Sequence, residues 1–170
     1  MRKEYITFPQ DMPINVVFAS IKEYPFHWHN CIQIIFVLEG TIKVTIESGT
    51  YELVKNDLEI INVDETHRIF SNDKNNKVLI FYFDINFFEK YYNDMENIFF
   101  YTNTSDDGAQ ASEEYDELRT MLSILLCEAV QKQVDYDEEI EATLVDLLYH
   151  LINNFHYLMY EKEDFRENKD

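Results

Sequence analysis

The stretch YPFHWHNCIQIIFVLEG, residues 24–40, decides the fold of this chain. Its apolar part, Ile32–Leu38, is rich in β-branched residues and is followed by a glutamate and a glycine, so it predicts a strand that ends at a turn. Before that strand, His27 and His29 are two residues apart, and in an extended backbone both imidazoles point to one face. Gln33 keeps the same parity if no bulge intervenes. We therefore expect three polar side chains to converge beside a buried strand.

Similar short runs rich in Val, Ile, Phe, Tyr and Thr continue on both sides of this stretch, with the spacing of an antiparallel sandwich or barrel. Gly40, Gly49 and Asn56 supply turns that need a left-handed backbone. The run Lys77–Phe83 is apolar on both faces, which is typical of a strand between a cavity and a layer of helices. The expected strands are Asn15–Lys22, Ile32–Leu38, Thr41–Glu47, Thr50–Val54, Leu58–Val63, His67–Ser71 and Lys77–Asp84.

After residue 84 the apolar period becomes helical. We expect a short aromatic helix over 86–97, a loop over 102–111, a helix that starts at Ser112 as N-cap, and a last helix over 136–161. The last helix carries two adjoining apolar stripes, and so wide a face usually serves two neighbours. One stripe is expected to form a homodimer interface, made by Leu144, Leu147, Leu151 and Phe155.

Composition excludes several classes of protein. The chain has 170 residues, of which 46% are hydrophobic, so a disordered chain is excluded. The net charge of −19 repels phosphate backbones, and we expect no direct contact with nucleic acid. Its two cysteines, Cys31 and Cys127, form no zinc or disulfide pattern. No leader or membrane-spanning stretch stands out, so we expect a cytoplasmic protein without membrane contact.

The charge is unevenly divided along the chain. After residue 104 lie 18 of the 33 acidic residues but only 5 of the 14 basic ones. We therefore expect a β-barrel region with an N-terminal arm and a short helix over residues 1–104, and a helical dimerisation region over residues 105–170. Together they are expected to form one compact domain.

The polar side chains of the barrel allow three interpretations. His67 begins a later strand that could run beside the first, which would bring it to His27, His29 and Gln33. These four could be hydrogen-bonded barrel residues, contacts for an organic effector, or ligands of a divalent Zn, Ni, Fe or Mn ion. Tyr82 could belong to the core or contact the same effector. No organic cofactor is expected.

The pattern His27-x-His29-x₃-Gln33-x₆-Gly40, followed by His67, resembles the two cupin motifs. Residues 14–84 and the two helices after them are more specifically similar to the effector-binding domain of AraC-type transcription regulators. The resemblance implies a mainly β fold with C-terminal α: a cupin-type double-stranded β-helix (jelly-roll) barrel followed by an antiparallel helix pair. It also implies that a small polar effector such as a sugar binds in the barrel.

By this resemblance, the effector would contact His27, His29, Gln33, His67, Tyr82 and Phe8. An arm around Phe8, Pro9 and Pro13 would fold over the barrel mouth.

The chain also departs from these families. Metal-binding cupins usually carry an acid where this chain has Gln33, a neutral group that cannot act as a general base. We therefore expect no enzyme; the alternative is a metal-dependent cupin enzyme, such as a small dioxygenase or a sugar isomerase. AraC regulators carry helix-turn-helix motifs after this domain, and those motifs are absent here. We expect the natural protein to continue past Asp170 into a DNA-binding domain; otherwise it is a stand-alone sugar-binding domain.

Overall fold

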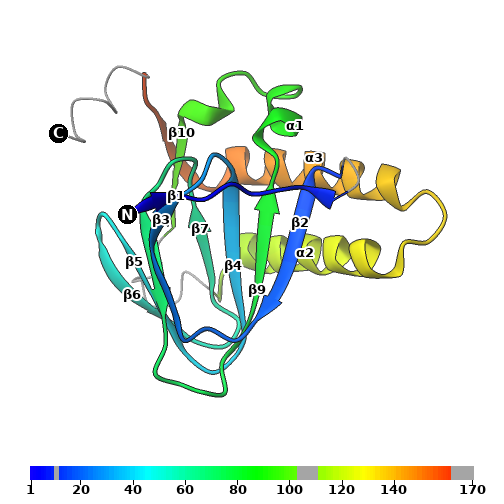
Figure 1. The fold of residues 1–170 in the computed structure, drawn as a ribbon. Helices are drawn as coiled ribbons and strands as arrows, with labels where there is room; N and C mark the ends of the chain where they lie inside the picture. The colour runs from blue at the N-terminus through cyan, green and yellow to red at the C-terminus, as the bar shows by residue number, and fades with distance from the viewer. Residues whose placement is uncertain (10–11, 103–110, 162–170) are drawn as a thin grey trace.

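The computed structural model describes residues 1–9, 12–102 and 111–161, and in them two β-sheets face each other with two long helices beside one sheet (Figure 1). The strands are β1 Arg2–Lys3, β2 Ile14–Ala19, β3 Glu23–Trp28, β4 Ile32–Glu39, β5 Ile42–Ile46, β6 Gly49–Leu53, β7 Leu58–Ile61, β8 His67–Phe70, β9 Lys77–Phe83, β10 Ile98–Tyr101 and β11 His156–Met159. The helices are α1 Ile85–Glu89, the 3-10 helix η2 Met95–Asn97, α2 Glu113–Gln131 and α3 Tyr136–Asn154.

The two sheets form the cupin-type jelly-roll barrel that the sequence predicts. One sheet has the order β1-β3-β8-β5-β6 and the other has the order β2-β9-β4-β7. A third, two-stranded sheet pairs β10 with β11. The expected turns are present: Asn56 and Gly40 have φ values of 74° and 75°. The expected boundary at residue 104 and the polar tail after Glu161 lie outside the described residues.

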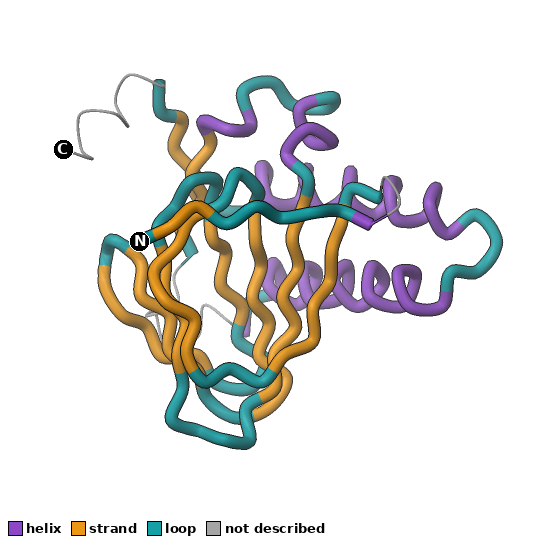
Figure 2. The backbone as a smooth tube through the Cα atoms, viewed as in Figure 1, coloured by secondary structure: helices purple, strands orange, loops and turns teal. Residues whose placement is uncertain are grey.

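The strand β9, inside the sheet β2-β9-β4-β7, is buried on both faces, as its apolar run predicts. Along β9, Leu79, Phe81 and Phe83 belong to one hydrophobic core, and the alternating residues belong to another. The first core continues into α2 and α3, so the helices cover the outer face of this sheet (Figure 2). The second core fills the space between the two sheets. The period of two in β9 therefore separates a helix-facing side from a barrel-facing side.

The helix α2 begins after Ser112, as predicted, and its apolar stripe packs into the shared core. Tyr115, Leu118, Leu122 and Leu125 are buried, and Met121 and Ala129 pack partly buried beside them. The part of the chain that the structure describes contains no helix long and apolar enough to cross a membrane.

The last helix is shorter than the sequence predicts. It ends at Asn154, and Phe155 adopts an extended backbone. The Asn154 side-chain amide donates to the carbonyl oxygen of His150, which competes with continuation of the helix. Residues after Phe155 instead form β11, antiparallel to β10. Met159, which the helical period places on an α3 stripe, therefore lies in a strand.

The aromatic helix expected over 86–97 is also interrupted. Asp84 caps its start, because the Asp84 carboxylate accepts from the Asn86 backbone amide. The helix α1 then stops at Glu89, and Asp94 takes a left-handed backbone with φ of 61°. The Glu89 carboxylate accepts from the backbone amides of Asp94 and Glu96, which stabilises the turn in place of a continuous helix.

The structure corrects the expected dimer interface. Leu144, Leu147 and Leu151 are fully buried within the chain itself, in the core that α3 shares with α2 and the sheet. Phe155 packs edge-on against Tyr115, with ring centroids 5.1 Å apart. The wide apolar face of α3 is thus used mostly inside the protomer. Leu144, Leu147 and Leu151 therefore offer no surface to a second copy, whereas Phe155 is half-buried.

Candidate functional site

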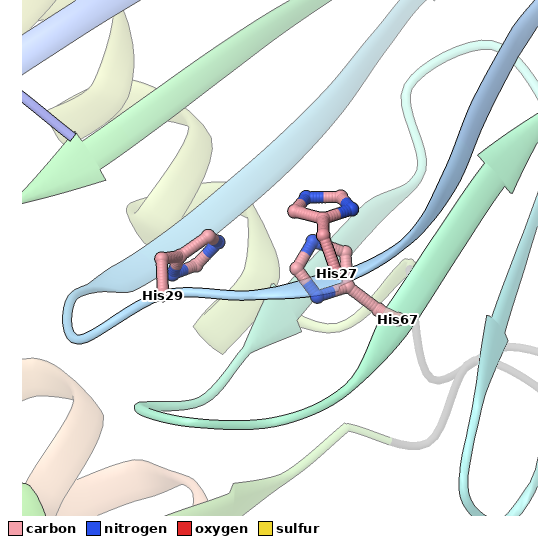
Figure 3. A group of neighbouring side chains, drawn as sticks. All are labelled: His27, His29 and His67. Carbon is pink, nitrogen blue, oxygen red and sulfur yellow. The ribbon is translucent and has the colours of Figure 1, made fainter. Parts of the chain in front are cut away.

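Three histidines meet inside the barrel (Figure 3). His27 lies near the end of β3, His29 follows that strand, and His67 begins β8. His27 and His67 are paired across the two strands, and their ring centroids are 4.1 Å apart. One ring nitrogen of each imidazole lies within 4.8 Å of the others, and all three residues are at most 1% exposed. The cluster is therefore a compact, buried nitrogen-donor site.

Backbone carbonyls set the orientation of these rings. Nδ1 of His27 lies 2.8 Å from the carbonyl oxygen of Pro25, and Nδ1 of His67 lies 2.9 Å from that of Glu65. A carbonyl oxygen only accepts, so in both residues the proton is on Nδ1. Nε2 then carries a lone pair, and in both residues this atom is buried without a hydrogen-bond partner among the described residues.

His29 is held by the strand that follows it. Its Nδ1 lies 3.0 Å from the Cys31 carbonyl oxygen, and its Nε2 lies 2.7 Å from Oε1 of Gln33. The amide nitrogen of Gln33 is buried without a partner. The structure thus brings together His27, His29, Gln33 and His67, the four residues that the sequence analysis places on one face.

Burial keeps His27 and His67 uncharged. It lowers the pKa of His27 and lowers that of His67 to about 3, so these two imidazoles are neutral at physiological pH. Burial also raises the pKa of the Cys31 thiol to about 12. Neutral imidazoles with free lone pairs accept either a hydrogen bond or a metal ion.

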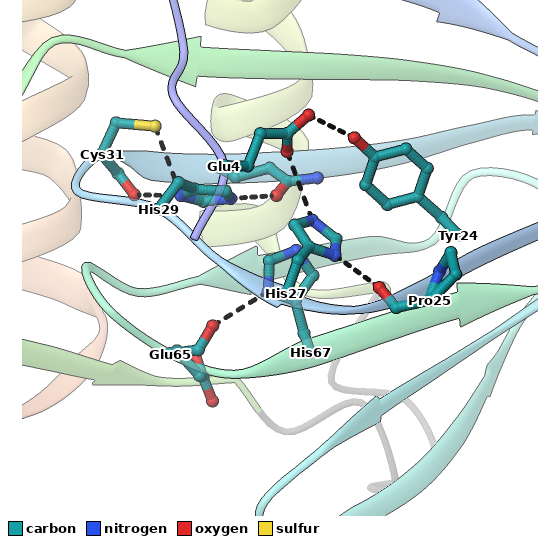
Figure 4. Close-up of polar contacts among 9 residues, drawn as sticks. Glu4, Tyr24, Pro25, His27, His29, Cys31, Glu65 and His67 are labelled. Atoms are coloured by element: carbon teal, nitrogen blue, oxygen red, sulfur yellow. Dashed lines mark hydrogen bonds and ion pairs between the residues drawn. The ribbon is translucent and has the colours of Figure 1, made fainter. Parts of the chain in front are cut away.

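A carboxylate from the N-terminal segment reaches the same site (Figure 4). The backbone amide of Glu4 donates to the Trp28 carbonyl oxygen at 2.8 Å, next to the parallel pairing of β1 with β3. Its Oε1 accepts a hydrogen bond from the Tyr24 hydroxyl, and its Oε2 lies 3.5 Å from Nε2 of His27. Burial, with the bond to Glu4 second, raises the pKa of Tyr24 to about 12, so this hydroxyl stays a donor.

A cavity of about 330 Å³ lies between the N-terminal segment and the barrel wall. The N-terminal segment and the barrel wall both contribute polar groups to the cavity, and Glu4 is the single charged residue among those that line it. The lining residues are Glu4, Tyr5, Ile6, Thr7, Asn15, Val17, Ala19, Ile21, Tyr24, His27, Ile69, Ile80 and Tyr82.

The cavity includes only some of the residues expected to contact a ligand. His27 and Tyr82 line it, whereas His29, Gln33 and His67 are fully buried elsewhere in the barrel interior. Phe8 packs partly buried against the inner core and is not among the lining residues. The arm expected around Phe8 is present, but its earlier residues 4–7 form the cavity wall.

Sequence reasoning missed Glu4 and Tyr24. Glu4 belongs to no motif, and it reaches the site only because a two-residue strand pairs with β3. Tyr24 begins the YPFHWH stretch, and its ring meets that of His27 edge-on at 4.4 Å. A bulge between these two residues alters the simple alternation of β3. No sequence signal identifies Glu4 as a site residue. Tyr24 could have been identified, because it lies three residues before His27 in the sequence.

The donor set fits a divalent transition metal. Imidazoles that ligate a metal usually donate their other N–H to a carbonyl or carboxylate, and His27 and His67 do this. Two buried nitrogens without partners are a further sign, because such atoms are rare in folded proteins. His27, His29 and His67, with the amide oxygen of Gln33, could hold Zn, Ni, Fe or Mn.

A comparison with known families gives one match. The sequence model of the family described as "AraC-like ligand binding domain" matches residues 20–148. That range includes all three histidines and most of α3, but not the N-terminal segment that carries Glu4. Among curated protein sequences, none matches the chain.

Solved structures with a similar barrel share little sequence with this chain. KdgF from Halomonas sp. is 17% identical, over 42% of this chain and 70% of its own, with a TM-score of 0.40. A cupin-2 domain containing protein from Shewanella frigidimarina is 19% identical, over 46% and 76%, with a TM-score of 0.37. Oxalate decarboxylase of Bacillus subtilis is 21% identical, over 45% and 22%, with a TM-score of 0.41.

Proposed function

Because this chain belongs to the AraC-like ligand-binding domain family, we propose that it is the effector-sensing and dimerisation part of an AraC-type transcription regulator. The observation that carries the proposal is the cavity of about 330 Å³ between the N-terminal segment and the barrel. DNA contact would come from a further domain, because a chain of net charge −19 repels phosphates. A cytoplasmic location goes with this role and remains a prediction.

The lining of the cavity favours a small neutral, polyhydroxylated effector such as a sugar. Tyr24 and Tyr82 offer aromatic rings with hydroxyls, and Asn15 and Thr7 add further polar groups. No lysine or arginine is among the lining residues, whereas Glu4 contributes a carboxylate. An anionic effector such as a sugar phosphate would therefore meet repulsion and no compensating charge. The volume matches that of small-ligand sites.

Ligand binding in this cavity can be coupled to the position of the N-terminal segment. Residues 4–7 form one wall, and side chains from β2, β3, β8 and β9 form the other. A ligand that touches both walls binds more tightly when the N-terminal segment lies against the barrel, and it therefore stabilises this closed state. The closed segment would then change how an attached DNA-binding domain is presented.

The effector class can be tested by thermal unfolding and calorimetry with neutral monosaccharides, sugar acids and sugar phosphates. A neutral sugar is expected to raise the unfolding temperature. Its affinity should fall about 3- to 10-fold in Tyr82→Phe, because one hydrogen bond is lost. Tyr91→Phe, an equivalent change on an exposed tyrosine outside the cavity, should leave the affinity unchanged. Binding of anionic sugars alone, or full affinity in Tyr82→Phe, would contradict this effector class.

We place the proposed dimer contact on the outer stripe of α3. Ala142, Val145, Tyr149 and Ile152 follow a 3-4-3 spacing, which is the pattern of a helix seam. Tyr149 is 45% exposed, and Val145 and Ile152 are half-buried. The many acidic residues of the helical region would repel a second copy, so added salt should strengthen the dimer.

Light scattering on Tyr149→Glu tests this contact. The variant is expected to be a monomer at concentrations at which the unchanged chain is a dimer. Val134→Glu places the same charge on an apolar side chain that is 89% exposed, in the turn between the helices, and should remain a dimer. A monomeric unchanged chain, or a dimeric Tyr149→Glu variant, would show that this stripe is not the interface.

A metal-dependent cupin enzyme is a second candidate, because the three imidazoles form a donor set that fits a metal ion. A bound ion would supply Lewis-acid or redox chemistry there. Gln33 offers no general base, which counts against catalysis. Near-stoichiometric metal in purified protein, lost in a His27→Ala, His29→Ala double variant, would favour this candidate. A metal-free protein that still binds a sugar would remove it.

A further inference from the structure

We propose that Glu4 is the carboxylate ligand of a divalent metal ion held by His27, His29 and His67, so that metal binding locks the N-terminal segment over the barrel. The proposal rests on the metal-binding interpretation of the histidine cluster, and it is independent of the effector class. In it the N-terminal segment supplies the acid that Gln33 does not provide inside the barrel.

The carboxylate of Glu4 contacts the imidazole of His27. Oε2 of Glu4 lies 3.5 Å from Nε2 of His27, and both atoms are buried without a hydrogen-bond partner. Because Nδ1 of His27 donates to the Pro25 carbonyl oxygen, Nε2 presents a lone pair to the carboxylate. Two buried acceptors that face each other at this distance repel, and a cation between them removes the repulsion.

The distance between the Glu4 carboxylate and the His27 imidazole also fits a shared metal ion. Zinc binds imidazole nitrogen and carboxylate oxygen at nearly equal lengths, so a tetrahedral centre separates two such donors by about 3.4 Å. The observed 3.5 Å between Glu4 and His27 matches this edge. His29 and His67 offer the further nitrogens, within 4.8 Å of each other and of that of His27. On metal binding, His29 would exchange its contact with Gln33 for the ion, and the Glu4 carboxylate, which lies outside this 4.8 Å group, would move toward it.

Two hydrogen bonds hold Glu4 in position. Its backbone amide donates to the Trp28 carbonyl oxygen, and the Tyr24 hydroxyl donates to its Oε1. The Tyr24 bond holds one carboxylate oxygen, and the other oxygen points to His27, as Figure 4 shows. A ligand oriented in this way by a second hydrogen bond is typical of metal sites.

The consequence is a metal-dependent latch. Residues 5–7 of the same segment line the cavity, so a metal held through Glu4 would fix one wall of the effector site. Metal and effector would then favour the same closed state, and each would raise the affinity of the other.

The test is calorimetry of the metal-free 170-residue chain with Zn²⁺, and absorption spectroscopy with Co²⁺. We expect one ion per chain, roughly 10- to 100-fold weaker binding in Glu4→Gln, and a changed Co²⁺ spectrum in that variant. Glu23→Gln removes an exposed carboxylate of β3 and should bind as the unchanged chain does. Hydrogen exchange at the Glu4 amide should slow on Zn²⁺ addition, but not in Glu4→Gln.

Each other outcome overturns the proposal in a recognisable way. If Glu4→Gln binds Zn²⁺ within twofold of the unchanged chain, the histidines hold metal without Glu4. If Glu4→Gln speeds hydrogen exchange at the amide of residue 4 equally with and without Zn²⁺, Glu4 holds the N-terminal segment by direct contact with His27 and not through a metal ion. If the unchanged chain binds neither Zn²⁺ nor Co²⁺, no metal site exists, whereas sugar binding in the cavity would still stand.

Discussion

The two faces of the sheet β2-β9-β4-β7 are built from the same strands but differ in chemistry. The face toward the helices is closed by Phe81, Phe83 and leucines of α2 and α3, all fully buried. The face toward the barrel carries aliphatic residues, but it ends at a cluster of imidazoles, an amide and a phenol. Among the described residues, the buried side-chain nitrogens without a hydrogen-bond partner belong to this cluster: Gln33 comes from β4, and His27 and His67 come from the facing sheet. Stability and binding are thus assigned to opposite sides of one sheet.

The largest effect is expected on the helix-facing side. Phe81 is fully buried and stacks near Phe83 with ring centroids 6.3 Å apart. Phe81→Ala should lower the free energy of unfolding by about 3–5 kcal/mol, because it leaves a cavity in a packed core. Urea denaturation measures this. Phe18→Ala, on a β2 side chain that is 64% exposed, should change stability by less than about 0.5 kcal/mol. Equal losses of stability in the two variants would show that the helix-facing core does not stabilise the fold more than the exposed surface does.

A substitution on α3 tests whether Leu147 belongs to the core of the protomer or to an interface with a second copy. Leu147→Ala should lower the free energy of unfolding by about 2–5 kcal/mol, because the side chain is fully buried in the shared core. The folded variant should keep the oligomeric state of the unchanged chain, measured by light scattering. A small stability loss together with loss of the dimer would show that Leu147 faces a second copy after all.

The smallest effect on stability is expected inside the barrel. His67→Leu removes a buried nitrogen without a partner and also the bond to the Glu65 carbonyl. These effects oppose each other, so the free energy of unfolding of the metal-free chain should change by about 1 kcal/mol or less. Zn²⁺ binding should be lost. A loss of several kcal/mol without added metal would mean that His67 is structural, and the contrast between the two faces would fail.

The barrel could be predicted from sequence because its signals are local. Because the run of β9 is apolar on both faces, it indicates the barrel interior on one side of the strand and a layer of helices on the other. The spacing of His27, His29 and Gln33 indicates that their side chains converge. The register of the strands then brings His67 opposite His27. Turns at Gly40 and Asn56 followed from residue types that tolerate a left-handed backbone.

The remaining features depend on contacts between distant segments. The strand β11 pairs with β10, and Ile98 and Met159 become neighbours although they are far apart in sequence. A helical period that continues through Phe155 and Met159 cannot reveal that pairing. The burial of Leu144 and Leu147 depends on how α2 and the sheet divide the wide face of α3. Glu4 reaches the histidines through the pairing of β1 with β3, which no motif announces.

The central claim is that the barrel interior presents unprotonated imidazole nitrogens to a ligand. Nitrogen-detected NMR of the histidine side chains in the metal-free chain tests it most directly, because it distinguishes the two tautomers and the imidazolium. At neutral pH we predict that His27 and His67 are neutral with the proton on Nδ1, and that Zn²⁺ shifts their Nε2 signals. Protons on Nε2, or charged imidazoles, would contradict the account.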